Sequence, residues 1–106
     1  MAKYLFVANF TAEGARGILA EGGTRRREAL ETTFASLGGT LESFYFAFGS
    51  DDVFLIGELP GNPAAAAAAL TTSASGAVHT RTVVLLTPEE VDTAAKLSPA
   101  YRAPGA

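Results

Sequence analysis

The strongest constraint on the fold is the stretch from Phe44 to Pro60, FYFAFGSDDVFLIGELP, in which two apolar runs flank a polar turn at 49–52. Side chains alternate between the two faces of a β-strand, and both runs place large apolar residues on both faces. A hairpin with one face in water would alternate apolar and polar residues instead. The stretch therefore predicts a β-hairpin that must be covered on both sides.

The composition predicts one compact domain. The chain has 106 residues, of which 48% are hydrophobic and 18% are charged, as in folded globular proteins. Its net charge is -3, and Arg25–Arg27 is the only basic block, which argues against nucleic acid as a partner.

Several site classes are also excluded by residue type. The chain has no cysteine, so disulfides and thiolate metal sites are ruled out, and one histidine by itself cannot build a closed zinc site. We therefore expect no metal and no cofactor. The amino end does not resemble a signal peptide, and no segment approaches the roughly 20 apolar residues of a membrane span. We expect a cytoplasmic protein of bacterial type that does not bind membranes.

The remaining elements follow from periodicity and from capping residues. They are a strand at 4–10, a helix at 12–37 capped by Thr11 and broken at Gly22 and Gly23, an alanine-rich helix opened by Asn62 as its cap, a strand at 77–86, and a short helix from a capping box at 87–90 to Leu97. Residues 1–97 are predicted to form the domain, and 98–106 a flexible tail.

The order βαββαβ predicts a ferredoxin-like α+β fold, a four-stranded antiparallel sheet with both helices on one face. The helices cover only that face, while the strands are apolar on both. We therefore expect a second copy to cover the other face, giving a two-fold dimer of facing sheets. In the alternative, the last helix or the tail covers this face within one chain.

Several local sequences support a family resemblance. The helix ending Ala35–Gly39, the pair Phe44–Tyr45 and the hairpin ending Glu58–Pro60 resemble the GYD-domain family, in the dimeric α/β-barrel superfamily, over residues 3–90. Asp51 stands where the tyrosine of the family's Gly-Tyr-Asp turn is expected. The resemblance implies a homo-oligomer with a pocket between helices and sheet or at the dimer seam, and it implies no assigned reaction.

His79 is the first candidate catalytic residue, because an imidazole titrates near neutral pH and can act as a general base. Arg81 lies on the same strand face and would hold an anionic substrate. In the alternative, His79 is a strand-end residue paired with a carboxylate or with solvent.

Glu58 and Tyr45 are candidates for proton transfer. Glu58 is a carboxylate late in an apolar strand, where it either pairs with a cation such as Lys3, Arg25 or Arg27 or has a raised pKa suited to acid/base work. Tyr45 is a core or seam aromatic whose hydroxyl could donate a proton.

The run Arg25–Arg27 follows the glycine break, at a helix N-terminus where an anion is favoured and would offset the cost of three cations. Arg25 and Arg27 are the candidate anion ligands. The alternative is an exposed face paired with Glu28 and Glu31.

Three functions remain open. The favoured one is a homo-oligomeric module that binds a small apolar or anionic molecule. The second is a cofactor-independent enzyme, of monooxygenase, isomerase or cyclase type, acting on a small aromatic or polyketide-like substrate. The third is a structural subunit of a larger assembly.

Overall fold

The computed structural model describes residues 1–106. Its elements are β1 (Ala2–Phe10), α1 (Ala12–Glu21), α2 (Gly23–Ser36), β2 (Thr40–Phe46), β3 (Val53–Leu59), α3 (Asn62–Ala74), β4 (Val78–Leu85) and α4 (Pro88–Ala95). The strands form one antiparallel sheet in the order β2-β3-β1-β4. This strand order is that of a ferredoxin-like domain, so the predicted α+β fold is confirmed.

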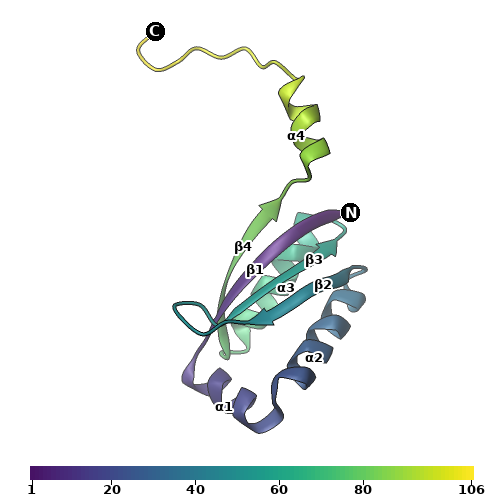
Figure 1. The fold of residues 1–106 in the computed structure, drawn as a ribbon, viewed down its shortest axis with the longest axis vertical. Helices are drawn as coiled ribbons and strands as arrows, with labels where there is room; N and C mark the ends of the chain where they lie inside the picture. Colours follow the sequence, from purple (N-terminus) through teal and green to yellow (C-terminus); the bar gives the residue numbers. More distant parts are fainter.

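The core lies between the sheet and the helices α2 and α3 (Figure 1). Tyr4, Phe6 and Ala8 of β1 alternate with residues that point to the other face, and they pack against Phe34 of α2 and Ala65 of α3. Phe6 and Phe34 meet edge to face, with ring centroids 5.8 Å apart. The alternation predicted for the central strands therefore sets which residues form the core.

Gly22 separates α1 from α2, as the sequence predicts. Its φ of 82° lies in the left-handed region that glycine adopts without steric cost. Thr11 caps α1 by accepting a hydrogen bond from the Gly14 amide, and its own hydroxyl donates to the Gly76 carbonyl. This second bond ties the start of α1 to the segment that leads into β4.

The start of α3 differs from the prediction. Gly61, not Asn62, is the N-cap residue, and Asn62 is the first residue of the helix. The Asn62 side chain instead accepts a hydrogen bond of 2.7 Å from the hydroxyl of Tyr4, a buried residue of β1. A buried tyrosine hydroxyl needs a partner, and this need takes the amide away from the capping role.

The second face of the sheet, which we call the open face, carries no helix. On it Leu5 lies between Ile56 and Val83, and Val7 lies between Phe54 and Arg81. Tyr45 continues this second row beside Phe54 and is 71% exposed. The open face is therefore apolar at its centre, as the hairpin predicts.

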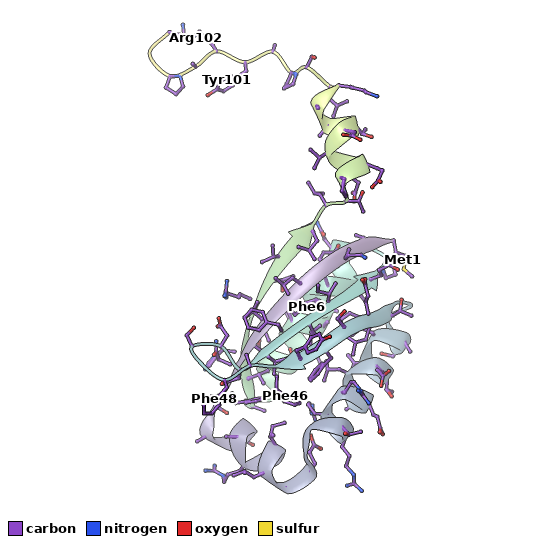
Figure 2. All side chains as sticks on the ribbon, in the orientation of Figure 1. Met1, Phe6, Phe46, Phe48, Tyr101 and Arg102 are labelled. Carbon is purple, nitrogen blue, oxygen red and sulfur yellow. The ribbon has the colours of Figure 1, made fainter.

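The carboxyl-terminal segment does not cover the open face. α4 and the tail extend from the end of β4 away from the sheet (Figure 1), and all residues from Pro88 to Ala106 are exposed. Tyr101 and Arg102 lie on the tail, far from Phe6 in the sheet (Figure 2). Of the two covers considered for this face, the one supplied by the same chain is absent from this structure.

Gly57 provides a test of the core packing. A Cβ atom at this position would overlap the Phe34 ring and the Thr40 carbonyl. We expect Gly57→Ala to lower the free energy of unfolding by about 1–3 kcal/mol, measured by urea denaturation. Gly17→Ala is the matched control, because nothing lies within 4 Å of a Cβ there. It should stabilise the exposed helix by up to about 1 kcal/mol. Equal stability of the two variants would contradict this packing.

Candidate functional site

A cavity with a volume of about 270 Å³ lies between α2, α3 and the helix-covered face of the sheet. Eleven of its seventeen lining residues are hydrophobic. Its walls include Phe6, Phe10, Leu30, Phe34, Phe44, Leu55, Ala68 and Thr72. A concave, mainly apolar space of this kind is a typical small-molecule site.

The cavity depends on the small side chains of α3. Ala68 faces the sheet and is 7% exposed, and it is followed on the same side of the helix by Thr72. Larger residues at these positions would fill the space in front of the aromatic rings on the sheet. Ala68, the one alanine of the run at 64–69 that lines the cavity, therefore leaves room beside Phe6 and Phe44.

Arg26 is the one charged residue that lines the cavity. It stands four residues before Leu30 and eight before Phe34, so the three lie on the inner face of α2. Its Nε donates a hydrogen bond of 2.8 Å to Glu21 Oε1. Its two terminal nitrogens have no hydrogen bond to a protein acceptor, so they are free to bind an anion at the edge of the cavity.

The sequence placed the whole run Arg25–Arg27 at the start of a helix, but the residues named as anion ligands were Arg25 and Arg27, not Arg26. Both of those arginines are exposed, and neither lines the main cavity. Arg27 borders a second, shallower hollow with Phe44 and Phe46. The signal that identifies Arg26 is its spacing from Leu30 and Phe34, which places it on the buried side of the helix.

His79 and Arg81 lie on the open face, at the end of the sheet that holds the hairpin loop. Arg81 Nη2 is 3.4 Å from Asp51 Oδ2, and the other Asp51 oxygen accepts a bond of 3.1 Å from Asn9 Nδ2. His79 is the cross-strand neighbour of Asn9. Asp51, at the position expected to hold the family tyrosine, therefore ties the loop to β1 and β4.

Asp52 makes a separate contact. Its Oδ2 accepts a hydrogen bond of 2.8 Å from the amide of Phe10, the last residue of β1. The loop is thus fixed by both of its acidic residues, each bound to a different group of β1.

Glu58 lies at the other end of the open face, opposite Lys3 in the pairing of β1 with β3. Lys3 itself forms an ion pair of 2.7 Å with Glu42. Glu58 pairs with Lys3 and His79 pairs with Asn9, and these two partners lie at opposite ends of β1. From the rise per residue of a strand, Glu58 and His79 are therefore about 20 Å apart along the strand direction.

The candidate catalytic residues are thus not brought together by one chain. Tyr45 lies in the row of Phe54 and Val7, between the two ends of the open face. His79, Glu58 and Tyr45 all lie outside the cavity, on the opposite side of the sheet from Arg25 and Arg27. Their chemical roles stay predictions.

The structure also bears on metal binding and on membrane insertion. The structure contains no group of three or more His, Asp or Glu side chains arranged to hold a metal ion. None of its helices has both the length and the apolar character needed to cross a bilayer.

The comparison with known proteins gives one match. A family model described as the GYD domain matches residues 4–95, from β1 to the last residue of α4. No curated protein and no solved structure matches the chain significantly.

The Lys3 pair provides a pH test. The hydrogen bond to Glu42 raises the pKa of Lys3 above its ordinary value of 10.5; desolvation opposes this shift, and the charges of Glu42 and Glu58 add to it. The pair therefore stabilises the fold below pH 10.5, and this stabilisation is lost as the pH rises through the raised pKa. By NMR titration, Glu42→Gln should lower the Lys3 pKa toward 10.5. Glu89→Gln, on the distant α4, should leave it unchanged, and an unchanged value in Glu42→Gln would refute the assignment.

Proposed function

The chain belongs to the GYD-domain family, and from that premise we propose that it is a homo-oligomeric module that binds a small amphipathic anion in the cavity between α2, α3 and the sheet. The ligand has an apolar body and one carboxylate or similar anionic group. The observation that carries this proposal is the composition of the cavity, an apolar space with a single charged residue, Arg26, in its lining.

The size and lining of the cavity define the ligand class. A volume of about 270 Å³ lies near the lower end of the roughly 300–1,000 Å³ that small-molecule sites occupy. Aromatic walls at Phe6, Phe34 and Phe44 favour an aliphatic or aromatic body. The ligand is therefore a small molecule rather than a peptide or a nucleotide.

The charge of Arg26 defines the ligand's other end. A guanidinium binds a carboxylate through two parallel hydrogen bonds, and only Nε of Arg26 is engaged, by Glu21. Because this ion pair leaves Arg26 half-exposed, an anion can reach the terminal nitrogens without breaking it. A neutral ligand of the same shape would lose this contact.

Filling the cavity tests the location of the site. Octanoate, a small aliphatic carboxylate, should bind the wild-type protein in isothermal titration calorimetry. Ala68→Leu places a larger side chain in the cavity and should weaken binding at least about tenfold, with no fall in melting temperature. Ala66→Leu, on the exposed side of α3, is the matched control and should bind normally. Undiminished binding by Ala68→Leu would place the ligand elsewhere.

Removing the charge tests the chemistry of recognition. Arg26→Gln should lower octanoate affinity about tenfold or more, because a bond to a charged group contributes roughly 1.5–3 kcal/mol. It should leave the weaker affinity for neutral 1-octanol unchanged. Arg25→Gln removes the same charge one residue away, outside the cavity, and should bind octanoate normally. Equal losses in both variants would show a general charge effect rather than a specific contact.

The homo-oligomer is proposed to be a two-fold dimer that buries the open face. The open face carries apolar side chains that stay exposed within one chain, Tyr45 at 71%, Val83 at 39% and Phe54 at 37%. Burial of apolar area drives association, so these residues would form the interface.

A charge on the open face should separate the two copies. The wild-type protein should sediment as a dimer at micromolar concentration, and Phe54→Glu should sediment as a monomer because its carboxylate would be buried unpaired. Leu70→Glu is the control, since Leu70 lies on α3 and is 71% exposed. Wild-type protein that sediments as a monomer would overturn the proposed dimer.

A further inference from the structure

We propose that the ligand of the cavity carries a second polar group, a hydroxyl or a carbonyl oxygen, at the end opposite its anionic group. The hydroxyls of Thr80 in β4 and Thr71 in α3 bind this group, while Arg26 in α2 binds the anion. The ligand is thus an ω-hydroxy or ω-oxo carboxylic acid rather than a simple fatty acid. This inference rests on the proposed function and adds the second contact by which the cavity recognises its ligand.

The polar residues of the cavity lining are of two kinds. One kind is the guanidinium of Arg26. The other kind is a hydroxyl, carried by Thr33, Thr71, Thr72, Ser75 and Thr80. All of these except Thr33 belong to α3, to its C-cap or to β4. The hydroxyls therefore gather on one side of the cavity instead of being spread around it.

The hydroxyl side lies across the cavity from Arg26. The helix that carries Arg26, α2, packs mainly against β2, whereas α3 packs mainly against β4. These two strands are the opposite edges of the sheet, with β3 and β1 between them. Neighbouring strands are spaced by about 4.8 Å, so β2 and β4 are roughly 14 Å apart. A ligand that contacts both sides therefore needs several carbon atoms between its two polar groups.

The floor between the two sides is apolar. It is lined by Phe6 and Ala8 of β1 and by Leu55 of β3, which all point to the helix-covered face. None of these side chains has a hydrogen-bond donor or acceptor. The cavity accordingly fits a hydrocarbon body in the middle and polar groups only at its two ends.

Two of the hydroxyls have no hydrogen bond within the chain. The hydroxyls of Thr33, Thr72 and Ser75 each donate to main-chain carbonyls of the preceding helical turn, at 2.6 to 3.1 Å. Thr71 and Thr80 make no bond of this kind, although both line the cavity. A free hydroxyl can donate one hydrogen bond and accept others. These two residues can therefore bind either a hydroxyl or a carbonyl oxygen of a ligand.

Thr80 occupies a position of β4 that faces the core. It lies opposite the buried Ala8 in the pairing of β1 with β4, and it is half-buried. Thr82 points to the same side two residues later, but it is exposed and does not line the cavity. The shape of threonine favours strands, a reason that applies to both residues. Only at Thr80 does the hydroxyl also meet the cavity, which makes Thr82 the matched control.

Matched ligands test the second contact. Octanoate, 8-hydroxyoctanoate and 2-hydroxyoctanoate share chain length and charge and differ only in the hydroxyl. In isothermal titration calorimetry, 8-hydroxyoctanoate should bind the wild-type protein about three- to tenfold more tightly than octanoate, as one additional hydrogen bond allows. The 2-hydroxy acid should gain nothing, because its hydroxyl lies beside the carboxylate. If 8-hydroxyoctanoate binds no more tightly than octanoate, the inference is overturned.

Removing the two hydroxyls tests the residues. The double variant Thr71→Val, Thr80→Val keeps the side-chain shape and should bind octanoate within about twofold of wild type. It should lose the preference for 8-hydroxyoctanoate, because the ligand hydroxyl would then be buried without a partner. Thr82→Val, outside the cavity, should keep the preference. A preference that persists undiminished in the double variant would also overturn the inference.

These measurements separate the inference from the proposed function. Protein that binds none of the three acids would overturn the cavity as an anion site, and the inference with it. Protein that binds octanoate in an Arg26-dependent manner, but without a preference for 8-hydroxyoctanoate, would overturn the second contact alone. In that case the proposed function would stand.

Discussion

Central strands that are apolar on both faces require two covers, and the rest of the structure follows from how each cover is supplied. On one face, Tyr4, Phe6 and Leu55 are covered by α2 and α3 and form the core. On the other, no helix covers the row through Val7, Phe54 and Tyr45: Val7 is buried among its neighbours, but Phe54 and Tyr45 stay exposed. Burial of apolar area drives association as well as folding, which is why this face, and not the helix-covered one, is the proposed dimer interface.

The helix-covered face is not packed uniformly. Near Leu59 and Gly57 the contacts are close, because the glycine lets the Phe34 ring approach the strand backbone. Farther along, the small side chain of Ala68 in α3 leaves the cavity beside Phe6 and Phe44. The close contacts near Leu59 and Gly57 therefore hold the helices in place. Because the helices are held there, the cavity can stay open, although unfilled space costs packing energy.

Sequence patterns predicted the fold well where a local physical rule applies. The glycine break, the capping box at Thr87 and the alternation of the strands are each determined by a few neighbouring residues, and each is confirmed. The prediction for Asn62 was wrong because a residue 58 positions away, Tyr4, binds its side chain. Such a contact depends on the tertiary fold, which local capping rules do not include.

The candidate site was less predictable for the same reason. Residue type singled out His79, Glu58 and the arginines at 25 and 27, but chemistry at a site needs convergence in space. Strand register separates His79 from Glu58, and helix phase puts Arg26, not its neighbours, beside the cavity. The phase of α2 was readable from Leu30 and Phe34. The cavity itself could not be predicted from the sequence, because it depends on the distance between α3 and the sheet.

The two ends of the sheet are organised differently. At one end, Asp51 and Asp52 fix the hairpin loop to β1 and β4, and Thr11 ties α1 to the turn before β4. The cavity residues Phe10 and Val78 belong to this fixed end. At the other end β4 leaves the sheet and leads into α4, where all residues are exposed. All lining residues of the cavity that belong to strands point to the helix-covered face, so the cavity shares no side chain with the open-face residues Tyr45, Phe54 and Val83.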